Sequence, residues 1–237
     1  MRLTSIDVIE GTIELRSGLH IGTSDTEMSI GGIDNPIAKH PITGIPYIPG
    51  SSIKGKIRSL LEWHAGVVAL TNGAPLNWEQ AKKAPDQAYA KAIVKLFGNS
   101  ADARMPIEEA KELGPTRLSF WDCPLTQECL QNVQDKGLPI TEEKSENSID
   151  RISSVATNPR FTERVPSGAE FDFKVTLKRI SEDPEGLIKH LHTGLKLLEL
   201  DGLGGSGSRG YGKIRFTRLA IAGEDIIDKV RSIDLSD

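Results

Sequence analysis

The sequence predicts an α+β fold built on a ferredoxin-like βαββαβ core that carries large insertions. In three segments, residues 3–16, 169–180 and 213–217, apolar residues alternate with polar ones, which is the period of a half-buried strand. Residues 51–64 and 184–200 carry apolar residues at helical spacing. The order of these segments along the chain predicts a sheet with two helices on one face and the other face free to bind a ligand.

The first strand leads into a long loop. Ile13 and Leu15 alternate with polar neighbours, and the apolar parity changes near Gly11, which predicts a bulge or bend. Residues 17–50 are rich in Gly, Pro, Ser and Asp. A loop of this length inside a compact domain is usually functional, so this segment is the first indication of a site.

The first helix, residues 51–64, combines an apolar face with a cationic one. Its apolar face is formed by Ile53, Ile57, Leu60 and Leu61. Lys54 and Arg58 are four residues apart and share a neighbouring face. Ser51 or Ser52 can cap the first turn.

The middle of the chain is less regular. Residues 66–115 predict a helical insertion, a lid, in which Gly98 ends a helix. Residues 116–123 are a strand candidate. Residues 135–168 are polar and rich in turn formers, so we expect an exposed excursion there and not core.

The second helix, residues 184–200, ends before a glycine-rich loop. Gly202 follows its last turn, and five glycines fall between Gly202 and Gly210. The last predicted strand follows, with Ile214 and Phe216 on one face.

Composition places the chain among soluble globular proteins. It has 237 residues, of which 38% are hydrophobic and 26% charged. Its two cysteines exclude a disulfide framework and favour a reducing compartment. We find no apolar run long enough to cross a membrane and no signal-peptide core, so we expect a cytoplasmic protein without a membrane partner.

The net charge of −4 by itself argues against nucleic-acid binding, but the charges are unevenly distributed. Residues 51–61 and 202–222 each contain several Lys or Arg residues and no acid. Two basic segments on a mildly acidic body can build an anion site, whereas solvated faces are the simpler interpretation.

The glycine-rich loop is a candidate anion site. It lacks the GK[ST] of a Walker A motif, and it follows a helix where a dinucleotide fingerprint would precede one. Closely spaced glycines let the backbone approach a polyanion with its N–H groups outward, and a flexible turn is the alternative. The candidate contacts are Gly204, Gly205, Gly207, Ser208, Arg209 and Gly210.

Other residues suggest contacts of the same kind. Ser51 and Ser52 at a helix N-terminus, beside Lys54 and Arg58, make a phosphate site or an ordinary capped surface helix. His20 is a phosphate contact, a base or a structural residue.

Asp34 is the candidate catalytic residue. A loop carboxylate can hold a divalent cation or orient a nucleophile, although an aspartate before Asn-Pro more often makes a turn. Cys123 and Cys129 do not have the spacing of a structural zinc site, so zinc is not expected. The three tryptophans do not interleave with basic residues, so a base-stacking platform is not evident.

Taken together, these segments resemble one family, the repeated backbone RAMP subunit of type III-A (Csm) CRISPR effector complexes. The matching stretches occur in the family's order: GLHIGTSD (18–25), IGGIDNP (30–36), PYIPGSSIKGKIRSLLE (46–62), KLFGNS (95–100), SIDRISSVATNPRFTERVPSGAEFDF (148–173) and GLKLLELDGLGGSGSRGYGKIRF (194–216). The resemblance implies a single RAMP domain over residues 1–237, with an RRM-like core and insertions at about 17–50 (catalytic loop), 66–115 (helical lid) and 135–168 (thumb).

The resemblance also implies partners. They are CRISPR RNA (crRNA), single-stranded target RNA, other copies of the chain in a filament and other Csm subunits. The excursion around residues 140–168 is then a β-hairpin thumb that wedges between guide and target at regular intervals. Ile149 and Val155 would supply apolar atoms there, and Arg151 and Arg160 would supply cations.

The aspartate of the family that matches Asp34 is required for cleavage of the bound target RNA, supported by a divalent cation, Mg²⁺ or Mn²⁺. The expected reaction is metal-assisted attack by the RNA's 2′-OH, giving a 2′,3′-cyclic phosphate and a 5′-OH, with Asp34 orienting the hydrated metal. Three alternatives remain open: the type III-B backbone subunit, a non-cleaving RNA-binding filament and a stand-alone domain that binds a small anion.

Overall fold

The computed structural model is centred on a long strand, β1 (Leu3–Leu15), and describes residues 1–23, 35–99 and 105–236. β1 pairs antiparallel with β7 (Glu170–Ile180) on one side and with β8 (Ile214–Ile221) on the other. β3 (Leu118–Phe120) and β9 (Glu224–Asp225) complete a sheet of order β3-β7-β1-β8-β9. Four of these strands and the two long helices follow the chain order β1-α1-β3-β7-α6-β8, so the predicted ferredoxin-like core is confirmed.

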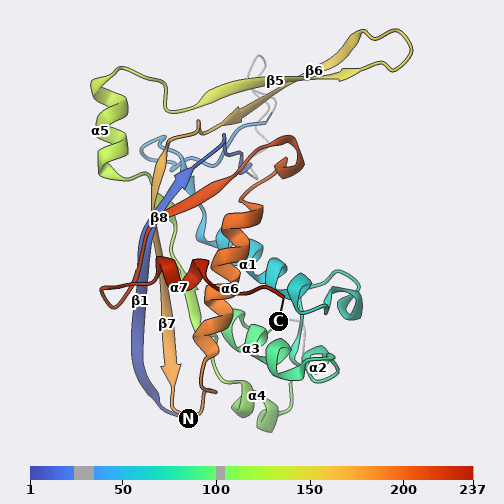
Figure 1. Cartoon of the computed structure of the whole chain (residues 1–237), viewed down its shortest axis with the longest axis vertical. Helices are drawn as coiled ribbons and strands as arrows, with labels where there is room; N and C mark the ends of the chain where they lie inside the picture. Colours follow the sequence, from blue (N-terminus) through green and yellow to red (C-terminus); the bar gives the residue numbers. More distant parts are fainter. Residues whose placement is uncertain (24–34, 100–104, 237) are drawn as a thin grey trace.

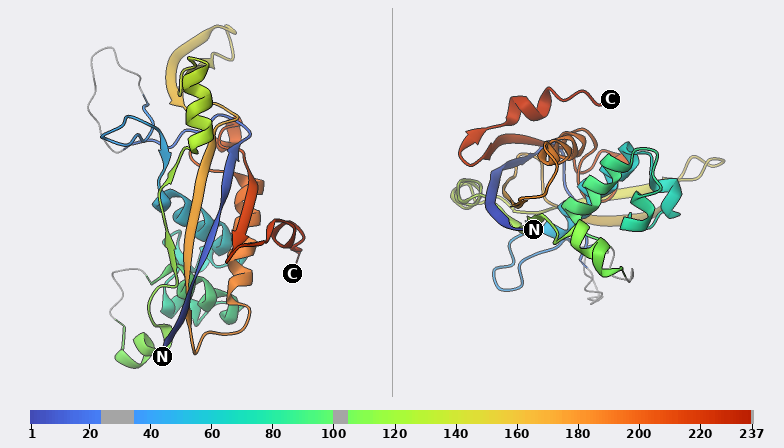
Figure 2. Two further views of the ribbon diagram at one scale, coloured as in Figure 1. Left: turned by 90° about the vertical axis from the view of Figure 1, so that its left-hand side faces the viewer. Right: turned by 90° about the horizontal axis from the view of Figure 1, so that it is seen from below.

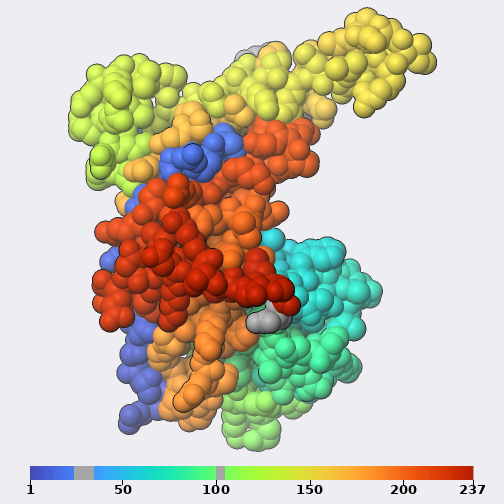
Figure 3. Space-filling model, viewed as in Figure 1, coloured from blue at the N-terminus to red at the C-terminus, as the bar shows by residue number. Residues whose placement is uncertain are grey.

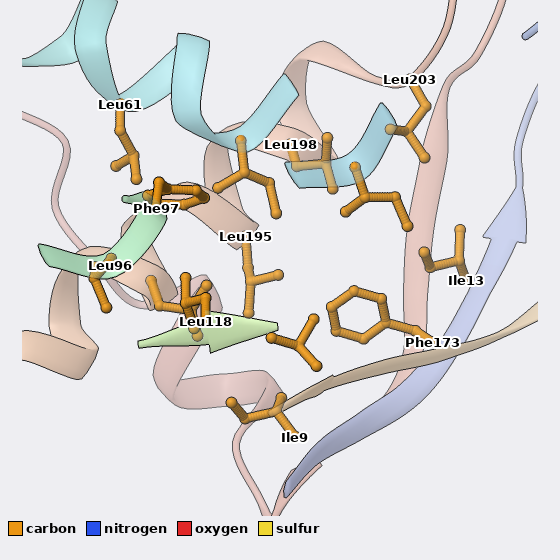
Figure 4. Packing of buried hydrophobic residues seen from close by; sticks show 14 of the residues in the cluster. Ile9, Ile13, Leu61, Leu96, Phe97, Leu118, Phe173, Leu195, Leu198 and Leu203 are labelled. Carbon is orange, nitrogen blue, oxygen red and sulfur yellow. The ribbon is translucent and has the colours of Figure 1, made fainter. Parts of the chain in front are cut away.

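Helices α1 (Gly50–His64) and α6 (Leu187–Asp201) cover one face of this sheet (Figure 2). Figure 4 shows Leu195 and Leu198 of α6 among the same buried side chains as the sheet residues Ile13 and Phe173, and Leu61 of α1 beside Phe97. The two helices pack closely at Gly194, where a Cβ atom would lie 2.5 Å from Ile57 Cγ2. The apolar spacing that predicts the helices is thus the spacing that buries them.

The irregularity predicted near Gly11 lies in the pairing of β1 with β8. Thr12 pairs with Arg218, whereas Ile13 pairs with Phe216, so β8 carries the extra residue. Along β1 itself, Ile9, Gly11, Ile13 and Leu15 are all buried without a change of parity. Ile6 is 52% exposed on the other face, so the apolar pattern changes parity because not every apolar residue of the strand faces the core. The predicted bulge is present, but it lies in β8.

The insertion between α1 and β3 is helical, as predicted. It contains η1 (Val68–Thr71), α2 (Trp78–Ala81), α3 (Gln87–Phe97) and α4 (Ile107–Leu113). Gly98 ends α3 with φ +95°, as expected for a helix C-cap. Leu96 and Phe97 join the core beneath α1, which ties the insertion to the sheet domain.

The polar excursion of the sequence forms a projecting hairpin, β5 (Glu142–Ile149) and β6 (Ala156–Arg164), which we call the thumb. It extends well beyond the body of the molecule (Figures 1 and 3). Helix α5 (Gln127–Asp135), which the sequence analysis does not predict, lies at the same end of the sheet on the opposite side.

Smaller elements complete the chain. β2 (Tyr47–Ile48) pairs with β4 (Cys123–Pro124), η2 (Gly207–Arg209) lies in the glycine-rich loop, and α7 (Ile227–Arg231) packs on α6 and β8. Among the described residues, no helix combines the length and apolar character needed to cross a membrane.

Candidate functional site

The glycine-rich loop, residues 203–212, folds against the segment that follows β1, directly beneath the thumb (Figure 1). The Gly205 amide donates to the His20 carbonyl at 3.0 Å, and the Gly212 amide donates to the Gly18 carbonyl at 2.9 Å. A Cβ atom at Gly204 would lie 2.3 Å from the His20 carbonyl oxygen. Some of these glycines are therefore required for close backbone packing.

The tip of the loop is available to a ligand. Ser206 has φ +60° and turns the chain into η2, and Gly207 has no atom within 4 Å of an ideal Cβ position. Within the described residues, the amides of Ser206, Gly207 and Ser208 make no hydrogen bond to a backbone carbonyl. Consecutive free amides in a turn form a concave anion-binding surface. The tip thus keeps the backbone geometry predicted for an anion contact, which stays a prediction, whereas Gly204 and Gly205 serve close backbone packing.

His20 adjoins this loop with its tautomer fixed. Its Nδ1 lies 2.8 Å from the Glu163 carbonyl oxygen. Because a carbonyl can only accept, we assign the proton to Nδ1, which leaves Nε2 as an acceptor in the neutral ring. The protonated ring could donate from Nε2 to a phosphate oxygen.

The N-terminus of α1 is capped differently from the prediction. The N-cap residue is Pro49, so the expected capping role of Ser51 or Ser52 is wrong, and both serines lie inside the first turn. The Gly50 amide donates to Asp122 Oδ1 at 2.8 Å. A carboxylate brought from a distant loop thus meets the helix dipole where the sequence indicates a phosphate.

Lys54 lies in the second turn of α1, two residues before Lys56. The ion pair of Lys56 with Asp201, 2.5 Å long, joins the start of α1 to the end of α6, where that loop begins. Burial and, secondly, the charge of Arg58 lower the pKa of Lys54. A bound anion would relieve both effects.

Arg58 points instead into the protein. Its Nε donates to Glu62 Oε1 at 2.8 Å, and one terminal nitrogen donates to the Leu76 carbonyl at 2.5 Å. The Leu76 amide returns a bond of 3.0 Å to the same Glu62 oxygen. Arg58 therefore anchors the helical insertion to α1, and its RNA contact stays a prediction.

The thumb presents the residues predicted for it. Ile149 and Val155 are 58% and 57% exposed, and Ile152 at the turn is 97% exposed. Arg151 and Arg160 are exposed as well. An apolar tip with flanking cations is suited to insertion between stacked bases beside phosphates.

Asp34 lies outside the described residues. The next residue, Asn35, bridges to Thr162 of β6, and its carbonyl accepts from the Glu163 amide at 3.1 Å. The described residues contain no cluster of His, Cys, Asp and Glu that could hold a metal ion, and the catalytic and metal roles of Asp34 stay predictions.

Cys123 is buried, and burial raises the pKa of its thiol to about 12. The absence of zinc stays a prediction from the spacing of Cys123 and Cys129.

Comparison with known proteins now identifies the family. The model of the RAMP superfamily matches residues 12–215. The chain belongs to the RAMP superfamily.

Several RAMP relatives carry one name, "CRISPR system Cms endoribonuclease Csm3". The relative from Methanothermobacter thermautotrophicus is 40% identical over 234 residues, covering 93% of this chain and 87% of its own. That from Streptococcus thermophilus is 43% identical over 212 residues, covering 87% and 85%. The predicted family is confirmed, since both relatives align along most of the chain.

Solved structures of RAMP proteins are similar to this chain as well. A chain of the "Csm3-Csm4 subcomplex in the type III-A CRISPR-Cas interference complex" is similar with a TM-score of 0.55 and 29% identity, covering 93% of this chain and 80% of its own. The Csm3 crystal structure from Methanopyrus kandleri has a TM-score of 0.57 and 27% identity, covering 91% and 76%.

Four residues around the glycine-rich loop, the thumb and the start of α1 are not predicted from the sequence: Asp122, Glu146, Glu163 and Tyr211. Each acts through a partner far away in the sequence, as Tyr211 does with Glu146 across 65 positions. The only local signal is the position of Tyr211 between two glycines, where a large side chain is unusual.

Proposed function

We propose that this chain is the backbone subunit of a type III-A CRISPR ribonucleoprotein, in which it binds crRNA and acts as an endoribonuclease on the paired target RNA. The observation that carries the proposal is its 40% identity, over 93% of its length, to a relative named as an endoribonuclease. Copies of the chain would line up along the guide beside other Csm subunits, one of which accompanies the Csm3 chain in the similar type III-A subcomplex.

The guide's phosphates would lie across one end of the sheet. The free amides of residues 206–208, Arg209, Lys54 and His20 are the donors available there. Amides and cations bind the backbone without reading bases, which suits a subunit whose specificity comes from guide pairing. Ser51 and Ser52 flank the same end.

The thumb would enter the guide–target duplex and expose one target nucleotide. Ile149, Ile152 and Val155 offer an apolar wedge, and Arg151 and Arg160 neutralise nearby phosphates. Regular spacing of the subunits would give cuts at regular intervals.

An unstacked nucleotide brings its own nucleophile. The 2′-OH, the phosphorus and the leaving 5′-oxygen can align once stacking no longer holds them apart, and such positioning can contribute about 7–11 kcal/mol to lowering a barrier. The products would be a 2′,3′-cyclic phosphate and a 5′-OH.

Asp34 would orient the reacting groups from the segment that precedes Asn35. A divalent cation, Mg²⁺ or Mn²⁺, would neutralise phosphate charge and acidify the 2′-OH when bound. Because the described residues contain no metal cluster, Asp34 and RNA oxygens are the ligands proposed for it.

The decisive experiment compares the wild-type complex with complexes carrying Asp34→Ala or Asp34→Asn, each assembled with guide RNA. We expect both variants to lose target cutting and to keep target affinity. Asp228→Ala, which alters an exposed aspartate of α7 outside the thumb and the glycine-rich loop, is the matched control and should still cut. Retained cutting in both Asp34 variants would refute the catalytic assignment, and lost target binding would refute the division of roles.

A chelator tests the metal separately. Removing divalent cations should abolish cutting and spare RNA binding, whereas cutting in excess chelator would refute the metal proposal. A type III-B complex chain has a TM-score of 0.56 but 18% identity, so that likeness concerns the fold alone.

A further inference from the structure

Tyr211 is a buried aromatic residue of the glycine-rich loop that both thumb strands contact. Only 1% of its surface is exposed. Lys144 Nζ of β5 lies 4.4 Å from the ring centroid, and the Arg164 guanidinium carbon of β6 lies 5.1 Å from it. Its hydroxyl donates to Glu146 Oε1 of β5 at 2.9 Å. One loop residue thus touches both strands at the base of the thumb.

Glu146 links the same loop to the thumb a second time. Its Oε2 lies 3.2 Å from Arg209 Nε, and Lys144 Nζ is 3.3 Å from its Oε1. The Glu146 side chain is only 18% exposed. Partial burial alone would raise the pKa of Glu146, but bonds from Tyr211 and Lys144 and the charge of Arg209 outweigh it and lower that pKa.

Among the described residues, these contacts lie close to the point where the thumb leaves the body. From Ala156 to Arg160 every residue of β6 is exposed, and the facing strand β5 contains no fully buried residue in its described length. An isolated two-stranded ribbon is marginal and has no core to set its direction. Its angle to the body must therefore be set at its base.

The base of the thumb also packs closely against the segment that follows β1. Arg164 pairs with Glu142 at 2.6 Å and lies over Gly18, where a Cβ atom would meet its side chain at 2.5 Å. The Gly18 carbonyl in turn holds the Gly212 amide. A closed ring of contacts thus runs from the loop to β5, β6 and back.

We propose that Tyr211 and Glu146 are positioning residues, which fix the angle of the thumb to the glycine-rich loop. Glu146 also holds the Arg209 guanidinium in one orientation. We call this contact between the thumb and the loop the joint. A further consequence rests on the proposed function: the joint sets where along the target RNA each cut falls.

Spin labels on the isolated chain test the joint without any RNA. Labels at Ile152→Cys and Ser59→Cys, in a Cys129→Ser background, report the distance from the exposed thumb turn to the exposed face of α1, while Cys123 is fully buried. Ile152 lies six positions after Glu146 in the sequence. At about 3.3 Å per residue the lever is about 20 Å long, so a swing of about 10° moves the label by about 3–4 Å.

We expect Glu146→Gln and Tyr211→Phe to broaden or shift the distance distribution by this amount, and Tyr211→Leu to do so further. Glu143→Gln, on the exposed side of the same strand, should leave it unchanged. Equal distributions in the wild type, Glu146→Gln and Tyr211→Phe would overturn the proposal. If Tyr211→Leu does not fold, the two milder variants decide.

Cutting by the assembled complex supplies the second readout. The joint variants should bind guide at least as tightly as the wild type, because Glu146→Gln removes a negative charge beside Arg209. Their cuts should spread to neighbouring phosphates, whereas general damage would lower all cuts in proportion and leave their positions unchanged. A wild-type complex that does not cut would refute the proposed function and leave the distance measurement valid.

Discussion

The helical side of the molecule and the thumb are held in place by different forces. Beneath α1 and α6, buried apolar side chains such as Leu195 and Phe173 interlock with the sheet (Figure 4). In the thumb, β5 alternates exposed and half-buried residues, and its base is joined to the body by Glu146, Tyr211 and Arg164. Apolar packing fixes the helical side over a wide buried surface, whereas the direction of the thumb depends on a few contacts at its base.

Truncating one apolar side chain in each region tests this contrast most strongly. Leu195→Ala, at a fully buried position, should lower the free energy of unfolding by about 2–5 kcal/mol. Val155→Ala, at a position that is 57% exposed, should change it by no more than about 0.5 kcal/mol. Urea denaturation of both variants measures the difference, and comparable losses would show that the thumb shares the core's packing.

A polar contact inside the helical side gives the next largest effect. Glu62→Ala removes the acceptor shared by Arg58 and the Leu76 amide. Because it leaves a largely buried guanidinium unpaired, we expect a loss of about 3 kcal/mol in the free energy of unfolding. Glu79→Ala, which removes a surface partner of Lys82, is the control and should leave the free energy of unfolding close to that of the wild type. A small loss in Glu62→Ala would mean that Arg58 is free to turn toward RNA.

The second helix makes the helical side sensitive to pH. Burial, helped by the charges of Lys229 and Arg179, lowers the pKa of His192 to about 4. An unfolded histidine titrates near 6.5, so between these values the unfolded chain binds the extra proton. Stability is therefore present in full above about pH 6.5 and falls by up to about 1.4 kcal/mol per pH unit toward pH 4.

Denaturation at pH 7.5, 6 and 5 should reveal this slope and its removal in His192→Gln. The exposed His40→Gln controls for the exchange itself. Carboxylates also titrate in the acid range, so the informative quantity is the difference between wild type and His192→Gln. An unchanged difference across these pH values would contradict the burial of a neutral imidazole.

The same contrast explains what the sequence could predict. The core elements follow apolar periodicity, as in the face of Ile53 and Ile57, and helix ends follow single residues such as Gly98 and Gly202. A short segment contains all the information that such features need. Strand and helix assignments could therefore be made before the structure was known.

Polar partners far apart in the sequence leave no such pattern. Asp122 caps α1 across 72 positions, and Glu146 meets Tyr211 across 65. The Ser51 or Ser52 cap was the reasonable local expectation, and it failed because a distant carboxylate satisfies the Gly50 amide. Local patterns point to cations such as Lys54 and Arg58, but which of them face outward depends on the tertiary fold.

Arg58 and Arg160 are both predicted from the sequence to contact RNA, but their surroundings differ. Arg160 is exposed on the thumb, whereas the Arg58 side chain is 13% exposed and bonded to Glu62 and Leu76. A side chain that contacts one phosphate releases about one counterion, so Arg160→Ala should reduce the slope of log affinity for RNA against log salt by about 0.7–1. Its free energy of unfolding should stay within about 0.5 kcal/mol of the wild type.

Arg58→Ala should behave in the opposite way, with lower stability and an unchanged slope, because its charge is already neutralised inside the protein. Binding titrations at several salt concentrations, paired with denaturation of each variant, separate the two residues. A reduced slope in Arg58→Ala would show that RNA draws this guanidinium away from Glu62, and the helical side would then be as adaptable as the thumb.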